Sequence, residues 1–438
     1  MHKLHKFFGL SAGLVILILS ITGFLLDHDN WNFLYTNTFK HYPSSLENAD
    51  KRLFSSYYVD PKNSKHILTG SKRGLYESFD GGKSFHKLLS LEINAIKEAS
   101  DKRLIFATSD GLYLKNSQKI TPFLLNGRYI NAISIYKDQL VAVEDKKTIY
   151  MIDISTQKIK KSLRVNIAKS ELQEDIKLSR FVRDLHYGRG LFDGDLSLLI
   201  NDYAAFVLTL LGVSGFVIWF YIYRKKAAKP ARKWIKFHAN IVTIIAIFPV
   251  LILLITGVFL DHNETLARFM KQVSIPHTVL PPVYSSLRAD IWSVDYDGKL
   301  LRVGNRYGVY KSKDLKKWVL ESRGFGYSLN RDGDLLYVGG MGASNRYFDG
   351  KWHILQHTPH MFKDVVKIDE KKSFFSAHQT DLPLPKFEDV TLYSLLLSLH
   401  DGTFFSSWWI WVNDYASLAM LLLFVTGSIR WWMKKKRR

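Results

Sequence analysis

Histidines beside long apolar segments are the residues of this sequence best suited to chemistry. Seven of the fifteen histidines have this position: His2, His5, His28, His186, His238, His262 and His400. Neutral imidazole is a good axial ligand for haem iron, and a histidine on each of two facing apolar helices makes a natural bis-histidine site. We therefore predict that His5 and His238 hold an inner haem. An outer haem is predicted between His186 and His400, with His28 and His262 as further candidate ligands.

Small residues accompany the first of these histidines. Following spacings of three and four, His5 shares a helical face with Gly9, Gly13, Ser20 and Gly23. The missing side chains would leave room for a flat macrocycle. Small residues at this spacing also promote close packing of helices in membranes, and interfacial histidines can simply be solvated. Packing is therefore the alternative interpretation.

Polar residues recur at the outer ends of the apolar runs. In the Asp-His pairs at 27–28 and 261–262, the aspartate could orient the imidazole. Adjacent residues on a helix do not face each other, which disfavours this. The Asn-Asp-Tyr strings at 201–203 and 413–415 start two runs. They are interpreted as helix caps in the headgroup region, or alternatively as a polar contact to a haem propionate or a quinone headgroup.

Four nearly uncharged apolar runs must carry these histidines. They cover residues 7–26, 203–222, 239–260 and 410–430. At about 1.5 Å per residue, twenty residues span roughly 30 Å, which is one hydrocarbon core. The first run is followed by Leu-Leu-Asp-His rather than by small residues, which favours a retained span over a cleaved signal peptide. Pro249 lies inside the third run, where it should kink the helix.

The positive charge of the chain is concentrated at one set of span ends. Segment 224–236 carries seven Lys or Arg and no acid, Lys3 and Lys6 precede the first run, and the C-terminus reads KKKRR. The positive-inside rule then places these segments and both termini in the cytoplasm, and residues 27–195 and 263–405 outside. This distribution argues against nucleic-acid binding and for the lipid bilayer as a partner. The absence of cysteine excludes disulfides and thiolate metal sites.

The two halves of the chain repeat one plan. TGFLLDH at 22–28 matches TGVFLDH at 256–262, and NDYAAFVLTLLGVSG at 201–215 matches NDYASLAMLLLFVTG at 413–427. A Leu-His pair precedes each NDYA string. Because two independent motifs recur in the same order, each half should run helix, outside domain, helix. We expect the four helices to pack as a pseudo-two-fold bundle.

The outside segments contain short strand–turn units. Residues 78–85 (SFDGGKSF) resemble the Asp-box repeats of sialidase-like and photosystem-assembly-factor β-propellers, with Ser78, Asp80, Gly82 and Phe85 as its structural residues. In such a box the aspartate and glycine form a tight hairpin turn and the last aromatic residue packs inward. A degenerate copy follows at 312–318. These residues are structural rather than catalytic.

Further units at 103–116, 138–154 and 334–355 bring the count to about three in each half, too few to close a ring alone. We therefore predict that both segments combine into one propeller of about six blades. The predicted fold class is a multi-domain membrane protein, with a four-helix transmembrane bundle of duplicated two-helix units and an all-β propeller-like extracytoplasmic domain. The predicted boundaries are helix 1 at 1–28, a β-rich segment at 29–184, helix 2 at 185–225, a basic cytoplasmic loop at 226–236, helix 3 at 237–262, a β-rich segment at 263–398, and helix 4 with the basic tail at 399–438.

The four spans resemble those of PepSY-associated transmembrane proteins, the group that includes inner-membrane siderophore-iron reductases. The resemblance rests on LHKFFGLSAGLVILILSITG at 4–23, on the Leu-His pairs, and on the Ser/Thr-Gly near the inner ends of spans two and four. It covers the spans alone, since the outside segments carry no PepSY-type sequence. The resemblance implies haem b bound by membrane histidines and electrons carried outward to a periplasmic ferric chelate.

We therefore expect a haem-binding electron-transfer protein of the bacterial inner membrane, multi-pass with both termini inside. As a transmembrane oxidoreductase it would reduce a periplasmic ferric chelate or redox partner, with quinol or a cytoplasmic donor supplying electrons. The alternative is a non-catalytic, membrane-anchored β-propeller that binds or assembles a periplasmic partner. A transporter is disfavoured because charged residues are absent from the middle of the spans.

Overall fold

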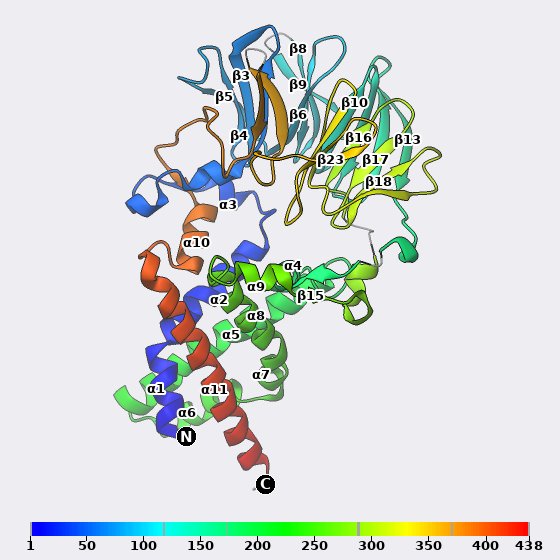
Figure 1. Cartoon of the computed structure of the whole chain (residues 1–438). Helices are drawn as coiled ribbons and strands as arrows, with labels where there is room; N and C mark the ends of the chain where they lie inside the picture. Colours follow the sequence, from blue (N-terminus) through cyan, green and yellow to red (C-terminus); the bar gives the residue numbers. More distant parts are fainter. Residues whose placement is uncertain (1, 117–118, 173, 287–289, 369–370, 437–438) are drawn as a thin grey trace. The chain divides into compact units, whose positions relative to one another are not determined.

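The chain divides into two compact units. The computed structural model describes residues 2–116, 119–172, 174–286, 290–368 and 371–436 (Figure 1). The helical unit comprises Met1–Glu47, Asp175–Val283 and Asp389–Arg438, and the β-rich unit comprises Asn48–Glu174 and Tyr284–Glu388. Arg437 and Arg438 of the predicted basic tail lie outside the described residues. Each unit is built from both halves of the sequence, so the repeats are interleaved rather than separate.

The helical unit contains the expected apolar helices. Three stretches are long and apolar enough to cross a membrane: Leu196–Arg224, Ile241–Asp261 and Ser407–Met433. They contain α5 (Leu196–Trp219), α7 (Ile241–Ile245) with α8 (Ile247–Asp261), and α11 (Ile410–Lys436). The fourth predicted span is a bent pair, α1 (His2–Ser11) and α2 (Gly13–Asp27), with an angle of 55° between its helices. The described residues therefore hold three candidate spans, or four if the bent pair counts as one.

Two helices are interrupted, and one of the interruptions was expected. The α7–α8 helix breaks at Ala246, three residues before Pro249. Proline lacks a backbone donor and its ring crowds the carbonyl of the preceding turn, so the break follows from Pro249. The bend at Ala12 was not predicted. Beside it, a Cβ on Gly13 would lie 3.0 Å from the ring of Phe216, so this ring packs directly against the backbone.

Short helices lie before two of the spans, where the sequence predicted continuous ones. They are α4 (Leu178–His186), which contacts α8, and α10 (Leu392–Asp401), which contacts α2. The chain turns after α4 at Gly188, whose φ of +60° suits glycine. The basic segment that was predicted as a cytoplasmic loop at 226–236 lies mostly within α6 (Ala228–His238). Apolar periodicity alone gave no separate signal for α4, α6 or α10.

Small buried residues let the spans approach closely. Ala204 and Ala416, the equivalent alanines of the two NDYA strings, are both 0% exposed. They share a core with Ala12, Val250 and Ala419. Small side chains permit close helix contacts in a membrane protein, where apolar burial supplies little drive.

The β-rich unit consists of antiparallel sheets that follow one another along the chain. The first three are β2 (Phe54–Asp60), β3 (Asn63–Ser71), β4 (Gly74–Ser78) and β5 (His86–Leu89); β6 (Ile93–Glu98), β7 (Leu104–Thr108), β8 (Gly111–Asn116) and β9 (Lys119–Leu124); and β10 (Ile130–Tyr136), β11 (Gln139–Glu144), β12 (Thr148–Asp153) and β13 (Lys158–Arg164). The second half adds β16 (Ser293–Tyr296), β17 (Leu301–Gly304), β18 (Gly308–Ser312) and β19 (Val319–Arg323); β20 (Ser328–Asp332), β21 (Leu335–Gly339), β22 (Arg346–Phe348) and β23 (Trp352–Ile354); and the two-stranded β24 (Asp364–Ile368) and β25 (Lys371–Phe375).

Neighbouring sheets touch through their first strands. Contacts run from β2 to β6, β10, β16, β20 and β24 in that order, and β24 also contacts β2. The two outside segments therefore form one compact unit, because β10 of the first half adjoins β16 of the second. β2 and β24 are also joined by a hydrogen bond: the backbone N–H of Tyr57 donates to Oδ2 of Asp364, with 3.0 Å between nitrogen and oxygen.

Aspartate side chains stabilise two hairpin turns of this unit through hydrogen bonds. Between β4 and β5, Asp80 Oδ1 accepts hydrogen bonds from Ser78 Oγ (2.8 Å) and from the Lys83 N–H (2.9 Å). Phe85, which follows the turn, packs against an apolar core cluster. In the second half Asp314 Oδ1 accepts from Ser312 Oγ at 3.1 Å. Both turns thus share a hydrogen bond from a serine hydroxyl to an aspartate carboxylate.

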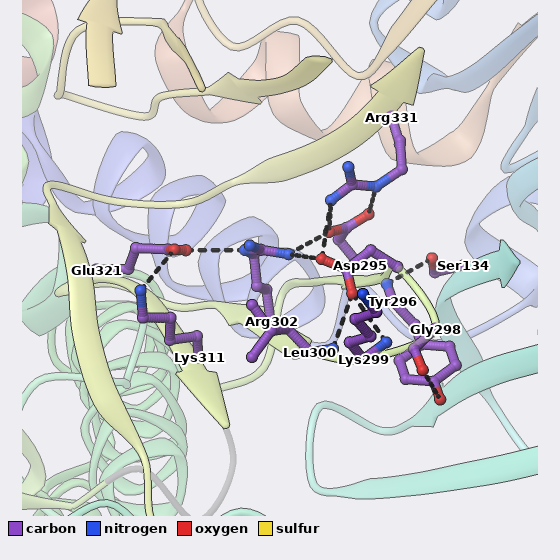
Figure 2. Close-up of polar contacts among 11 residues, drawn as sticks. Ser134, Asp295, Tyr296, Gly298, Lys299, Leu300, Arg302, Lys311, Glu321 and Arg331 are labelled. Carbon is purple, nitrogen blue, oxygen red and sulfur yellow. Dashed lines mark hydrogen bonds and ion pairs between the residues drawn. The ribbon is translucent and has the colours of Figure 1, made fainter. Parts of the chain in front are cut away.

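A buried ion network joins the sheets of the second half. The side chain of Arg302 is 4% exposed and donates to Glu321 (2.8 Å) and Asp297 (2.6 Å). Figure 2 shows Asp295 close to both Arg302 and Arg331, and Arg331 Nη2 lies 2.5 Å from Asp295 Oδ2. Because the desolvation of several charges is costly, such a network is stable only while every member stays paired.

Candidate paired-histidine sites

Two pairs of histidines face each other in the helical unit. The ring centres of His5, on α1, and His238, at the end of α6, are 6.3 Å apart with an interplanar angle of 88°. Those of His186, at the end of α4, and His400, on α10, are 6.2 Å apart at 56°. In each pair one histidine comes from each half of the duplicated chain. The structure thus brings together the two pairs that the sequence proposed.

Each of the four rings is held by a hydroxyl group. The Nδ1 atoms lie within hydrogen-bond distance of a Ser or Thr oxygen: His5 with Thr426 (2.8 Å), His238 with Ser214 (2.8 Å), His186 with Thr256 (3.0 Å), and His400 with Thr22 (2.9 Å). In every case the hydroxyl lies on a helix of the other half. Each ring is therefore held in its orientation by a residue from the other half of the duplicated chain.

The hydroxyl groups also define the tautomer of the rings. Each hydroxyl donates its one proton to the carbonyl four residues earlier, at 2.6 Å from Thr22 and Ser214 and 2.7 Å from Thr256 and Thr426. A hydroxyl that has donated its proton can only accept from the imidazole. The ring proton therefore lies on Nδ1 and the lone pair on Nε2. This is how outer partners prepare a histidine to bind a metal through Nε2.

A glycine follows each of these hydroxyl residues and makes room for the ring. A Cβ placed on the glycine would lie close to Cε1 of the imidazole: Gly23 with His400 (3.2 Å), Gly257 with His186 (3.5 Å), Gly427 with His5 (3.6 Å) and Gly215 with His238 (3.8 Å). The Ser/Thr-Gly pair thus forms a cradle that a larger side chain would fill. We call each such arrangement a histidine cradle.

The ring spacing fits two ligands on one ion. A metal–imidazole nitrogen bond is about 2 Å long, and a ring centre lies about 1 Å behind its nitrogen. Two imidazoles that shared one ion would therefore have ring centres at most about 6 Å apart. The observed values of 6.2 and 6.3 Å agree with this. No group of three or more His, Asp or Glu suited to a metal occurs among the described residues, so a donor set of two rings fits haem better than a bare cation.

A cavity adjoins the inner pair. It has a volume of about 660 Å³, within the range of small-molecule and cofactor pockets. Its lining is mainly apolar and includes His5, His238, Gly9 and Gly13, the glycines that the sequence placed on the face of His5. Lys6 and Arg430 also line it. The residues present therefore fit a large, flat, mainly apolar group beside the two rings.

Burial keeps the outer pair neutral. His186 and His400 lie on α4 and α10, outside the candidate spans. Desolvation by burial lowers the pKa of each imidazole below its usual value, and the proximity of His400 adds to this effect at His186. Neutral imidazole is the form that binds a metal.

His28 and His262 face carboxylates instead of the outer pair. His262 Nε2 lies 2.8 Å from Asp414 Oδ2, and His28 Nε2 lies 3.6 Å from Asp202 Oδ2. His28 also stacks on Trp31, with ring centres 4.2 Å apart. The contacts of the described residues therefore do not join either ring to His186 and His400.

The asparagines of the two NDYA strings support the outer pair. Asn201 Nδ2 donates to the backbone carbonyl of His186 at 2.9 Å and to Asp27 at 3.2 Å. Asn413 Nδ2 donates to the carbonyl of His400 at 3.2 Å and to Asp261 at 3.4 Å. The expected capping role is wrong, because both asparagines lie inside α5 and α11. They tie the ends of α4 and α10 to the spans instead.

Three solved structures resemble the chain at low sequence identity and at TM-scores below 0.5. The chain is similar to the extracellular domain described for a one-component system of B. thetaiotaomicron (11% identity, TM-score 0.34), over 76% of this chain and 31% of that one. It is also similar to the computationally designed Ika8 protein (8%, 0.32, over 72% and 65%) and to an ancestral GH74 enzyme (9%, 0.33, over 72% and 33%). The matches thus span less than two thirds of each of these proteins.

The chain matches one protein family along nearly its whole length. A search of the curated proteins finds no match. The model of the PepSY-associated TM region matches residues 2–434, nearly the whole chain, including both histidine pairs and the candidate spans. The match also includes the β-rich unit, so it is not confined to the spans as the sequence had suggested. This protein is therefore a membrane protein that belongs to the PepSY-associated transmembrane family.

Proposed function

We propose that this protein is a haem-binding membrane electron-transfer protein with two bis-histidine haem b sites. His5 and His238 hold the inner group, and His186 and His400 the outer one. The four histidine cradles carry this proposal, since they present Nε2 lone pairs in two pairs at a spacing suited to a shared ion. A bound haem b would supply one-electron redox chemistry.

The surrounding residues suit that chemistry. Thr22, Thr256, Ser214 and Thr426 hold the rings and make them better donors through Nδ1, while the glycines leave space at Cε1. Asn201 and Asn413 fix the ends of the helices that carry the outer pair.

The setting we propose is the bacterial inner membrane. The positive-inside rule favours both termini in the cytoplasm and the β-rich unit in the periplasm. The cyclic contacts of the first strands support a propeller of six blades, the last of them reduced to two strands. The aspartate turns at Asp80 and Asp314 support its kinship with Asp-box blades.

The proposed activity is that of a transmembrane oxidoreductase. Electrons from quinol or a cytoplasmic donor would pass from the inner to the outer site and on to a periplasmic ferric chelate or redox partner. The resemblance of the spans to a group that includes siderophore-iron reductases supports this direction. The second candidate is a membrane-anchored propeller that only binds or assembles a periplasmic partner. It is favoured by the aspartate turns of the β-rich unit, whose residues are structural rather than catalytic.

A reduced-minus-oxidised difference spectrum tests the proposal. Protein expressed with ample haem should bind two haems per chain, and His5→Ala and His186→Ala should each remove one of them. Exogenous imidazole should restore the lost site, which separates ligand loss from misfolding. His28→Ala is the matched control and should keep both. A haem-free wild-type protein, or spectra unchanged in both ligand variants, would leave only the anchored propeller.

A further inference from the structure

Helix α6 carries a stripe of positive charge on one face. Lys229, Arg232, Lys233 and Lys236 are all exposed, and their spacing of three, one and three residues places them together. Pro230 lies in the first turn of the helix, where its missing N–H costs no intrahelical hydrogen bond. The stripe is therefore part of a regular helix, and we call it the α6 cationic face.

The opposite face of α6 is packed against the protein. Ala231 is 3% exposed, Ile235 and His238 are half-buried, and the helix contacts α5. The rings of Trp234 and Phe237 meet edge to face, with centres 5.7 Å apart. Aromatic rings of this kind prefer the headgroup level of a membrane. One side of α6 is thus held by the protein, and the cationic side is turned away from it.

Among the described residues, the four charges of the α6 cationic face have no counter-ions. The segments 2–26, 203–260 and 415–436, which contain this end of the spans, include no Asp or Glu. Within the described parts of the chain, none of the four residues of the α6 cationic face pairs with a carboxylate. Four neighbouring cations repel one another, so an external anion would stabilise them.

The position of α6 in the chain identifies the anion. The helix follows the span that ends at Arg224 and precedes the one that begins at Ile241, so both of its ends are held at the level of the headgroups. A basic helix next to a span attracts anionic lipids. We propose that the α6 cationic face binds the phosphate groups of anionic phospholipids. Because His238 is the last residue of α6, the same lipids would hold the helix that places this ring against Ser214.

Lipid titration of the full-length protein tests this proposal. Binding of phosphatidylglycerol and phosphatidylcholine to the detergent-solubilised chain is counted by native mass spectrometry at several salt concentrations. One cation near an anionic surface changes the affinity roughly fivefold. We expect wild-type protein to prefer phosphatidylglycerol at least tenfold, and the preference to fall with salt.

The combined variant Lys229→Gln, Arg232→Gln, Lys233→Gln and Lys236→Gln should lose this preference. The matched control removes the same residue types from exposed positions of the β-rich unit, at Lys158, Lys161, Arg164 and Lys169, and should keep it. A variant with arginine at the three lysines should also keep it, which excludes a mere folding defect.

Three outcomes would overturn the proposal. The first is an unchanged lipid preference in the glutamine variant, and the second is an equal loss in the matched control. The third is displacement of phosphatidylglycerol by inorganic phosphate or by polyglutamate at the same concentration of charge. That result would identify a general anion site or a face for an acidic protein instead. None of these outcomes depends on whether the protein binds haem.

Discussion

Adding a single methyl group at Gly23 tests whether the histidine cradles are as close as the distances indicate. A Cβ at this position would lie 3.2 Å from Cε1 of His400, whereas a Cβ at Gly215 would lie 3.8 Å from Cε1 of His238. Carbon atoms in good contact are about 3.5–4.0 Å apart. The ring of His400 must therefore move by about 0.3 Å in Gly23→Ala, while nothing must move in Gly215→Ala.

The expected energies differ accordingly. Replacing glycine by alanine inside a helix is favourable by about 1 kcal/mol, so Gly215→Ala should stabilise the protein by roughly that amount. At Gly23 the displaced ring weakens its bond to Thr22, which is 2.9 Å long and of a kind worth about 1 kcal/mol. The two effects cancel, and Gly23→Ala should leave the stability nearly unchanged.

Thermal melting of both variants in one detergent measures the difference. A gap of 1 kcal/mol corresponds to about 2–4 °C for a unit of roughly 200 residues. Gly257→Ala and Gly427→Ala, with distances of 3.5 and 3.6 Å, should fall between the two. In haem-loaded protein, only Gly23→Ala should alter the low-spin signals of the outer site. Equal melting shifts in Gly23→Ala and Gly215→Ala would refute the reasoning.

Three further predictions concern other parts of the molecule. Thr256→Val should destabilise the protein by about 1–3 kcal/mol in thermal melts, because the buried Nδ1–H of His186 loses its acceptor, whereas Thr256→Ser should not. Arg302→Leu should cost the β-rich unit about 3–5 kcal/mol, because the buried carboxylates of Asp295, Asp297 and Glu321 lose the cation that they share and keep only Arg331 and Lys311. Arg302→Lys should be less harmful, as measured by hydrogen exchange in β16 and β17. The hydrogen bond to Glu77 raises the pKa of His66, so the protonated ring stabilises the fold below its unfolded pKa of about 6.5, and this contribution is lost as pH rises through the folded pKa. The difference in protection of β3 between wild type and His66→Gln should therefore shrink above neutral pH, and a constant difference would contradict this.

The sequence predicts the spans and the four central histidines because both depend on local features. A run of twenty apolar residues is readable without any tertiary contact. The repeated strings place His186 and His400 beside the outer ends of the spans, and His5 and His238 precede the two TG strings by similar distances. The interruption before Pro249 was predictable for the same reason, since its cause lies within one turn.

The partners of the histidines could not be derived from local features. The bond between His5 and Thr426 joins residues 421 positions apart, and it depends on how two helices rotate against each other. The bend at Ala12 lies beside Gly13, which packs on the ring of Phe216, another distant contact. The Ser/Thr-Gly pairs were visible in the sequence, but nothing in their spacing showed that each one receives an imidazole from the opposite half. The helical spacing of the charges in α6 was readable too, although the dense basic run had suggested a loop.

The exchange of partners between halves has an evolutionary consequence. A single helix–domain–helix unit contains both imidazoles and hydroxyl groups, but each imidazole is oriented by a hydroxyl group of the other unit, as His186 is by Thr256 and His400 by Thr22. Half-length ancestors could complete such sites only as symmetric dimers, whose formation depends on concentration. Gene fusion would have turned that association into an intramolecular event and let the two copies diverge. Co-expression of the two halves as separate chains should then restore what neither half achieves alone.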